Sequence, residues 1–332
     1  MDIDMRALKA LVNERGLGLD VVVGAIEDAL ALAYQRVPHA PVARVVLDRA
    51  NGHVTVWATE LDESGTPVGE YDDTPKDFGR IAAATARQVL MQRLQEAASD
   101  ATFRHFAAKE GDLVSGVVQQ NTDPRVVKVD LGEVEALLPA SEQSPGETYP
   151  HGARLRCLVT AVRRGAKGGP VVTVSRTHPQ LVRQLFALEV PEVADGSVEI
   201  AAIAREAGHR TKIAVWATKP GINAKGACIG PMGQRVRAVM SELNGEKIDI
   251  VDYDSDPARF VANALSPSRV SSVTVVDAAS KSARVVVPDY QLSLAIGREG
   301  QNARLANRLT GWRIDIRSDT EPGSSDDAAE SG

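Results

Sequence analysis

Two short glycine motifs carry the most specific chemistry in the sequence. Gly230-Pro-Met-Gly233 and Gly297-Arg-Glu-Gly300 are each followed by glutamine and, three positions further on, by arginine. Glycines at this spacing permit a tight turn and leave no Cβ to keep a ligand backbone away. A helix that begins directly after the turn offers its free N–H groups to a phosphate. The pattern therefore indicates a loop that binds the phosphates of a nucleic acid.

The two motifs belong to a longer internal repeat. The stretch around Gly230 recurs 67 positions later around Gly297, and the segment 245–250 recurs 66 positions later at 311–316. A single motif of this kind is as often a plain turn between two helices. Two copies closed by the same segment instead resemble tandem KH domains, whose Gly-x-x-Gly loop clamps a few nucleotides of single-stranded nucleic acid.

Periodicity predicts the elements that position the first loop. They are helices at Leu181–Leu188 and Val198–Arg205, a strand at Arg210–Ala217, a helix ending at Leu243, and a strand at Lys247–Val251, with Pro191 starting the unit.

The second unit is predicted in the same way. Its first helix has Asp256 as N-cap and Pro257 at the first helical position. A hairpin of Val270–Val276 and Ala283–Val287 precedes the second loop. Because only a few residues separate the two units, we expect a rigid tandem whose loops both bind one continuous RNA strand.

Short strands punctuated by glycine precede the repeat. They are predicted at Leu113–Val118, Arg125–Gly132, Val134–Pro139, Ala153–Val162 and Pro170–Arg176. Five such strands indicate a small OB-type barrel, and Val-Asp-Leu-Gly before Leu-Leu-Pro-Ala-Ser-Glu resembles its S1 version. The strands contain no aromatic residue on which bases could stack, so we expect weak RNA affinity or a spacer role.

The first 105 residues are predicted to form an α/β unit. Helices are expected at Met5–Arg15 and Leu19–Arg36, and two strands should flank a type I′ turn at Asn51-Gly52. A long helix, about Phe78–Ala107, should lead out of the unit.

Charge is distributed unevenly along the chain. The net charge is −6, but residues 1–105 carry 11 basic and 16 acidic side chains, whereas residues 191–317 carry 17 basic and 14 acidic. Five acids and no base follow from Ser318. This pattern favours modest RNA binding by the repeat. Two cysteines without metal-ligand spacing, and no signal peptide or membrane span, indicate the cytoplasm.

The whole chain resembles the NusA family of bacterial transcription elongation factors. The resemblance lies in segments 185–196, 204–215, 226–230, 245–250 and 295–306, and extends from the first helix to about Arg317. The chain looks like the short form found in high-GC Gram-positive bacteria, without acidic repeats after the second KH domain. The first loop differs in having Pro231-Met232 where a basic residue is common.

The resemblance implies a multidomain α+β protein. We expect an N-terminal polymerase-binding α/β domain with a long exit helix, an S1 (OB-type) barrel, two tandem KH domains of the prokaryotic type II and a disordered acidic tail, spanning 1–107, 108–180, 181–254, 255–317 and 318–332. The implied partners are core RNA polymerase near its β-flap, nascent single-stranded RNA including ribosomal RNA leaders, and other Nus-type factors. The family modulates pausing, termination and antitermination. We expect a monomer without membrane contact, metal or cofactor.

The predicted RNA-binding residues surround the two loops. They are Ile229, Gly230, Pro231, Met232, Gly233, Gln234, Arg235, Arg237, Arg210 and Lys212 in the first domain, and Ile296, Gly297, Arg298, Glu299, Gly300, Gln301, Asn302 and Arg304 in the second. By family geometry the arginines and Lys212 flank phosphates, and the two isoleucines line the groove for the bases.

Two other functions share these modules. A phosphorolytic exoribonuclease would need a catalytic domain with an acidic metal site, yet the remaining acids lack ligand spacing and the six histidines are scattered. A ribosome-associated RNA-binding protein would differ only in its partner. We therefore expect a noncatalytic RNA-binding regulator of transcription.

Overall fold

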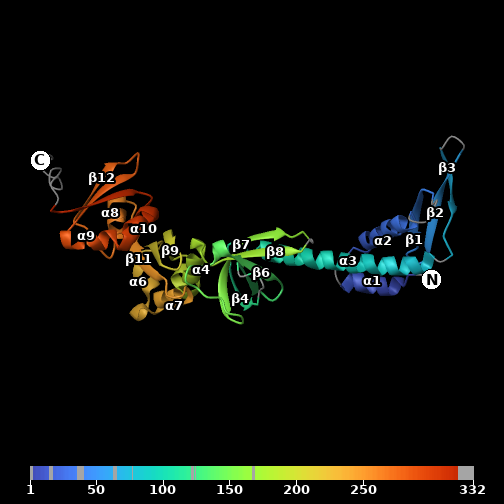
Figure 1. Cartoon of the computed structure of the whole chain (residues 1–332), viewed down its shortest axis with the longest axis horizontal. Coiled ribbons are helices and arrows are strands. Elements are labelled where there is room, and N and C mark those ends of the chain that lie inside the picture. Colours follow the sequence, from blue (N-terminus) through green and yellow to red (C-terminus); the bar gives the residue numbers. More distant parts are fainter. Residues whose placement is uncertain are drawn as a thin grey trace. The chain divides into compact units, whose positions relative to one another are not determined.

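The computed structural model describes residues 3–14, 18–35, 41–62, 66–76, 78–120, 123, 125–166 and 169–320 (Figure 1). The chain divides into two compact units. Unit 1 comprises Met1–His105 and Arg164–Pro170, and unit 2 comprises Phe106–Arg163 and Val171–Gly332. Ser318, the first residue of the predicted acidic tail, is the last residue of the final strand, and residues 321–332 lie outside the described part.

Unit 1 combines helices with an antiparallel sheet of order β1-β2-β3. Its elements are α1 (Met5–Glu14), α2 (Leu19–Tyr34), β1 (Ala43–Leu47), β2 (Val54–Leu61), β3 (Pro67–Asp72) and α3 (Phe78–Ala107). The core joins Ile26 and Leu30 of α2 to Val56 of β2 and Phe78 of α3. Leu8 and Val12 bring α1 into the same cluster.

The hairpin of unit 1 differs from its prediction. A type I′ turn needs positive φ at both central residues, but only Gly52 of the pair Asn51-Gly52 has it, at 76°. The strands are instead joined by residues 48–53, because β1 and β2 pair from Leu47 opposite Val54. Asp48 closes this wider turn by accepting the N–H of Gly52 at its carbonyl and that of Ala50 at its carboxylate. The edge strand β3, whose side chains are all exposed, was not predicted.

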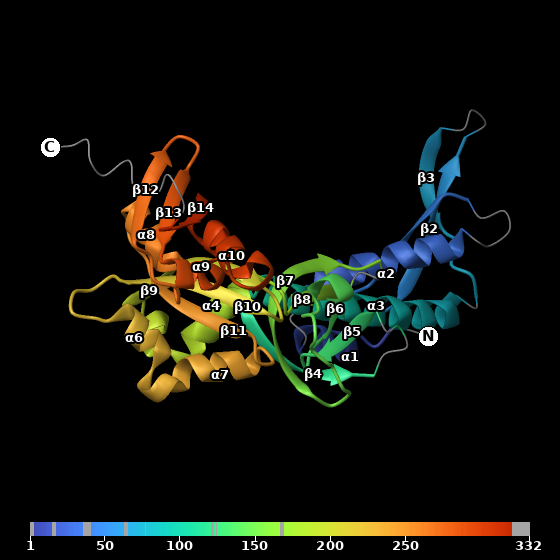
Figure 2. The same ribbon diagram turned by 60° about the vertical axis from the view of Figure 1, so that its left-hand side comes forward.

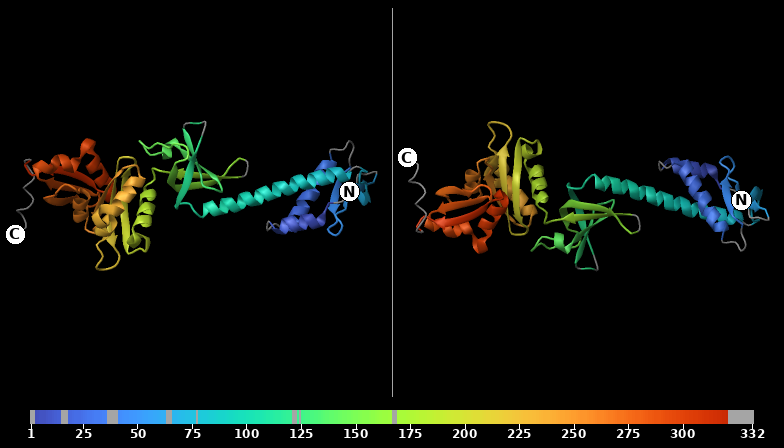
Figure 3. Two further views of the ribbon diagram at one scale, coloured as in Figure 1. Left: turned by 90° about the horizontal axis from the view of Figure 1, so that it is seen from below. Right: turned by 90° about the horizontal axis from the view of Figure 1, so that it is seen from above.

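The long helix α3 begins and ends where the sequence predicts. Phe78, Ala82 and Ala86 in its first turns pack into the core of unit 1. Figure 3 shows it as one continuous helix that extends past the sheet of this unit.

The first part of unit 2 is a closed five-stranded barrel of order β4-β5-β6-β8-β7. Its strands are β4 (Leu113–Gln119), β5 (Val126–Asp130), β6 (Glu135–Pro139), β7 (Arg154–Arg164) and β8 (Pro170–Ser175). Val118, Val129, Leu138 and Val172 fill the interior and are almost fully buried. The predicted OB-type barrel is confirmed.

The first KH domain (KH1) packs helices on one face of a sheet of order β11-β10-β9, in which β10 and β11 are parallel. Its elements are α4 (Pro179–Glu189), α5 (Pro191–Ala194), β9 (Val198–Glu206), β10 (Arg210–Ala217), α6 (Ala224–Ile229), a 3-10 turn (Pro231–Gly233), α7 (Gln234–Glu242) and β11 (Lys247–Asp252). The helix predicted at Val198–Arg205 is wrong, because this segment is the strand β9.

The second KH domain (KH2) repeats this arrangement with sheet order β12-β13-β14. Its elements are α8 (Pro257–Ala264), β12 (Ser272–Asp277), β13 (Ser282–Val287), α9 (Asp289–Ile296), a 3-10 turn (Arg298–Gly300), α10 (Gln301–Thr310) and β14 (Arg313–Ser318). The predicted N-cap is confirmed, since the Asp256 carboxylate accepts the N–H of Ala258.

The hydrophobic core of KH2 extends onto one face of the KH1 sheet. Helix α10 of KH2 packs against β9 and β10 on the face of the KH1 sheet that its own helices leave free (Figure 2). Ala204, Ala214 and Val251 from that face join Val261 and Leu305 of KH2 in a single buried cluster. Small side chains on the strands let the helix approach closely, which explains how the tandem is fixed without a linker.

A buried arginine joins the barrel to KH1. The Arg176 side chain is 2% exposed and donates to Glu147 of the barrel at 2.5 and 3.0 Å and to the Glu242 carbonyl of α7 at 2.6 Å. Tyr149 is part of this junction and donates its hydroxyl to Glu147. Its hydroxyl also accepts the N–H of Ser144 at 2.9 Å, so the tip of the Tyr149 side chain is held at this junction.

Within the described residues, no helix is both long and apolar enough to cross a membrane.

Candidate nucleic-acid interface

The two Gly-x-x-Gly loops have nearly the same backbone conformation. The φ angles are 73° at Gly230, 50° at Met232 and 73° at Gly233 in the first loop, and 77° at Gly297, 53° at Glu299 and 73° at Gly300 in the second. A non-glycine residue with positive φ costs about 1–2 kcal/mol. The third residue of each loop must therefore be stabilised by its surroundings.

An arginine from the following helix supplies that stabilisation. Arg237 of α7 donates a hydrogen bond to the carbonyl of Met232. Arg304 of α10 does the same for Glu299, at 3.2 Å. Sequence reasoning assigned both arginines to RNA phosphates, and the structure shows that each braces the loop that precedes it.

The first glycine of each loop is required for close packing. A Cβ on Gly297 would lie 2.8 Å from the backbone nitrogen of Asn302, and one on Gly230 would lie 2.6 Å from Cγ of Arg235. A Cβ on Gly300 would meet nothing within 4 Å. The second loop thus packs tightly at its first glycine and is open at its last.

The loop tips point into solvent. Met232 is 91% exposed, and the side chains of Arg298 and Glu299 are 93% and 83% exposed. Helices α7 and α10 start directly after the loops without a side-chain cap. Their first N–H groups are therefore available to an anion.

Two predicted contacts are structural. Asn302 is 2% exposed, and its side-chain amide donates to the carbonyls of Ala295 and Leu265. In KH1, Arg235 fills the matching place by donating to the carbonyl of Ala227 and to Glu192. Burial keeps the Asn302 side chain away from RNA, which corrects the prediction for this side chain.

The prediction that Lys212 flanks an RNA phosphate is also corrected. Its side chain is fully buried between the KH domains, where the ammonium donates to the Ser266 carbonyl at 2.6 Å and lies 3.1 Å from Asp249. Burial lowers the pKa of Lys212. Arg210 is also paired with Asp249, at 2.8 and 3.0 Å, but remains partly exposed.

The helix after the second loop is tied to KH1 through Glu206 of β9. Arg304 donates to this carboxylate at 2.5 and 3.1 Å, and Gln301 at 3.0 Å. These hydrogen bonds, that of Arg304 first, lower the pKa of Glu206 to about 2. A phosphate contact by Arg304 would have to compete with this ion pair.

The remaining predicted residues stay accessible. Ile296 is 39% exposed just before the second loop, whereas Ile229 is half-buried against the KH1 core. Gln234 is exposed at the start of α7.

Sequence reasoning missed a polar cavity beside the second loop. Its volume is about 560 Å³, and it is lined by Glu206, Gly208 and His209 of KH1 and by Arg298, Glu299, Gln301 and Arg304 of KH2. The sequence carries no signal for this cavity, because only the packing of KH2 on KH1 brings the turn 206–209 to the loop.

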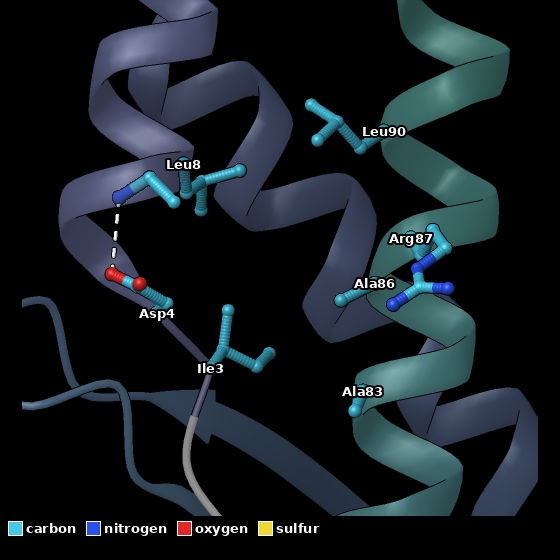
Figure 4. A pocket seen from close by; sticks show the side chains of 8 residues that line it. Ile3, Asp4, Leu8, Ala83, Ala86, Arg87 and Leu90 are labelled. Atoms are coloured by element: carbon cyan, nitrogen blue, oxygen red, sulfur yellow. Dashed lines mark hydrogen bonds between the residues drawn. The ribbon is translucent and has the colours of Figure 1, made fainter.

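A cavity of different character lies in unit 1, between α1 and α3 (Figure 4). Its volume is about 270 Å³, and its walls are mostly apolar, with Ile3, Leu8 and Leu90 beside the charged Asp4 and Arg87. The lining offers few groups that could bind a phosphate.

The described residues also bear on catalysis. They contain no group of three or more His, Cys, Asp or Glu side chains that could hold a metal ion. Both cysteines are buried, which raises the pKa of Cys157 to about 12 and that of Cys228 to about 11. Neither thiol is therefore activated as a nucleophile.

Comparison with known families matches each part of this architecture. The NusA N-terminal domain matches residues 5–61 and 58–100, the S1 RNA-binding domain 107–170, the NusA-like first KH domain 176–253 and the NusA-like second KH domain 257–323. Over 330 residues the chain is 59% identical to the transcription termination/antitermination protein NusA of Mycobacterium tuberculosis, which covers 97% of this chain and 95% of that protein. The chain belongs to the NusA family.

Other NusA proteins agree along the same length. The Bacillus subtilis protein is 46% identical and covers 95% of this chain and 90% of its own length, and the Thermus thermophilus protein is 38% identical and covers 93% and 88%. The predicted family, the fold class and the general function as a transcription factor with S1 and KH RNA-binding domains are confirmed.

Proposed function

We propose that this member of the NusA family binds single-stranded RNA along its two KH loops. The observation that carries the proposal is the recurrence of one backbone conformation in two exposed loops, each followed by an uncapped helix. The proposed contacts are Ile229, Gly230, Pro231, Met232, Gly233, Gln234 and Arg210 in KH1, and Ile296, Gly297, Arg298, Glu299 and Gly300 in KH2. The buried side chains of Lys212 and Asn302 do not take part.

Unit 1 supplies the contact with core RNA polymerase in this proposal, near the β-flap where nascent RNA emerges. The unit is acidic, and its helices expose apolar side chains that RNA would not use. Val21 and Leu32 of α2 are 65% and 62% exposed, and Met91 of α3 is 53% exposed. Such surfaces suit a protein partner. With unit 1 bound to polymerase, the KH loops would bind the transcript and so affect pausing, termination and antitermination.

The RNA contact is tested by placing carboxylates in each loop. The variants are Pro231→Asp with Met232→Asp in the first loop and Arg298→Asp with Glu299→Asp in the second. Each pair should weaken binding of single-stranded RNA at least tenfold by repelling phosphates, with circular dichroism unchanged because these side chains are exposed. Unchanged affinity in both variants would rule out RNA binding at the KH loops.

The polymerase contact is tested by pull-down. The full chain should retain core polymerase and not ribosomal subunits, and a chain beginning at Phe106 should lose polymerase but keep RNA binding. Retention of polymerase by the shortened chain would overturn the assignment of unit 1, and retention of ribosomal subunits instead would favour the ribosome-associated function.

A further inference from the structure

The polar cavity between KH1 and KH2 has the size and surroundings of a ligand site. Its volume of about 560 Å³ lies within the range of small-molecule pockets, about 300–1,000 Å³. It borders the second Gly-x-x-Gly loop, which supplies Arg298 and Glu299 to its wall. A ligand here would lie directly beside RNA bound at that loop.

The two walls of the cavity are fixed to each other. Glu206 on the KH1 side accepts hydrogen bonds from Arg304 and Gln301 on the KH2 side. The apolar packing of α10 on β9 and β10 continues next to this ion pair. A site formed before its ligand arrives loses less entropy on binding.

The turn that carries His209 is fixed as well. The N–H of Gly208 donates to Glu246 at 2.8 Å, and a Cβ on Gly208 would lie 2.3 Å from the carbonyl oxygen of Pro145 in the barrel. His209 donates its own N–H to the Glu206 carbonyl at 3.0 Å and accepts the N–H of Lys247 at 3.1 Å. The exposed imidazole of His209 therefore stands on a rigid backbone at the cavity wall.

We propose that this cavity holds one nucleotide of the bound RNA, with the imidazole ring of His209 stacking on its base and Arg298 facing its phosphate. Histidine is one of the aromatic side chains on which unstacked RNA bases stack. An arginine beside an aromatic ring suits a nucleotide, because a nucleotide carries an anionic phosphate and a planar base. The inference rests on the proposed RNA binding by the KH loops and adds a contact from the KH1 turn.

The test uses the full chain and a fluorescein-labelled pool of random-sequence single-stranded RNA 12-mers, with affinity measured by anisotropy. His209→Ala should weaken binding about tenfold, the loss expected for one stacked base. His209→Tyr should restore most of the affinity, because it keeps an aromatic face. His151→Ala is the matched control, since His151 is an exposed histidine in a loop of the same unit and does not line the cavity.

The outcomes separate this inference from RNA binding by the KH loops. Wild-type affinity in His209→Ala overturns the inference, while the loop variants with paired aspartates still report on the KH contacts. A His209→Tyr protein as weak as His209→Ala, or a His151→Ala protein weakened to the same extent, also overturns it. A lower melting temperature of His209→Ala with full rescue of affinity by stabilising osmolyte would assign His209 a structural role and overturn it too. A wild-type chain that binds no RNA overturns both proposals.

Discussion

In the part of the chain that the structure describes, α10 of KH2 covers the face of the KH1 sheet opposite its own helices, whereas the corresponding face of the KH2 sheet is partly exposed. The register of the parallel strands shows which positions of the two sheets correspond to each other. Lys212 lies opposite Asp249 between β10 and β11, and Arg284 lies opposite Asp315 between β13 and β14. A cation thus lies opposite an aspartate on the corresponding face of each sheet.

The surroundings of the two pairs differ greatly. The Lys212 side chain is 0% exposed and lies 3.1 Å from Asp249, whereas Arg284 and Asp315 are 35% and 53% exposed and 3.9 Å apart. Next to Lys212 stands the fully buried Ala214. This face is therefore an interface in KH1 and a polar surface in KH2, although the Gly-x-x-Gly loops of the two domains share one conformation.

The largest expected effect comes from adding a charge to the covered face. Ala214→Arg would force a guanidinium into the KH1–KH2 core and should destabilise the protein by more than about 4 kcal/mol. The matched Val286→Arg on the open face of KH2 should change stability by less than about 1 kcal/mol. Thermal unfolding of both variants measures the contrast, and equal losses would mean that the two faces are equivalent.

Removal of the cation should have a smaller effect of the same kind. Lys212→Ala leaves the Ser266 carbonyl without its donor and Asp249 partly unpaired in a buried place, so we expect a loss of about 3 kcal/mol. Arg284→Ala on the open face should cost less than about 1 kcal/mol. Urea denaturation gives both values, and a neutral Lys212→Ala would show that the buried ammonium contributes nothing to stability.

The loops allow a third comparison, between glycines. Gly297→Ala should cost about 2 kcal/mol, because strain at positive φ adds to the contact with the Asn302 nitrogen. Gly300→Ala meets open space and should cost about 1 kcal/mol from backbone strain alone. A larger loss in Gly300→Ala, measured by the same denaturation, would contradict the described packing of the loop.

The smallest effect concerns the ion pair of Glu206 and its dependence on pH. The pKa of Glu206 falls from 4.5 to about 2 in the folded protein, so its contribution is complete above about pH 4.5 and is lost as pH falls through about 2. Because the partner arginine is partly exposed, we expect less than about 1 kcal/mol. The difference in stability between wild type and Glu206→Gln should shrink over this window, and a difference independent of pH would contradict the pairing.

The elements that could be predicted are those whose pattern is local. The long helix α3, the barrel strands and both loops follow from periodicity and glycine spacing. The segment Val198–Arg205 was predicted as a helix, and its alanines do favour helices. In the structure Ala202 and Ala204 are small so that α10 can pack across β9, and that reason lies in a distant part of the chain.

The site residues divide in the same way. Loop glycines and exposed tips follow from the motif alone. The burial of Lys212 depends on Ser266 of the next domain, and the cavity beside His209 depends on the docking of KH2. Both depend on residues that are distant in the sequence. For this reason Lys212 was predicted to contact RNA and His209 was not singled out.

The most direct test of the central claim is the dependence of RNA affinity on length. The claim is that a rigid tandem presents both loops to one strand. Single-stranded RNAs of about 5 and about 12 nucleotides are titrated against wild type and the two loop variants with paired aspartates. The longer RNA should bind wild type much more tightly than the shorter one, and either loop variant should remove most of that gain. A gain with length that survives in both loop variants would contradict the claim.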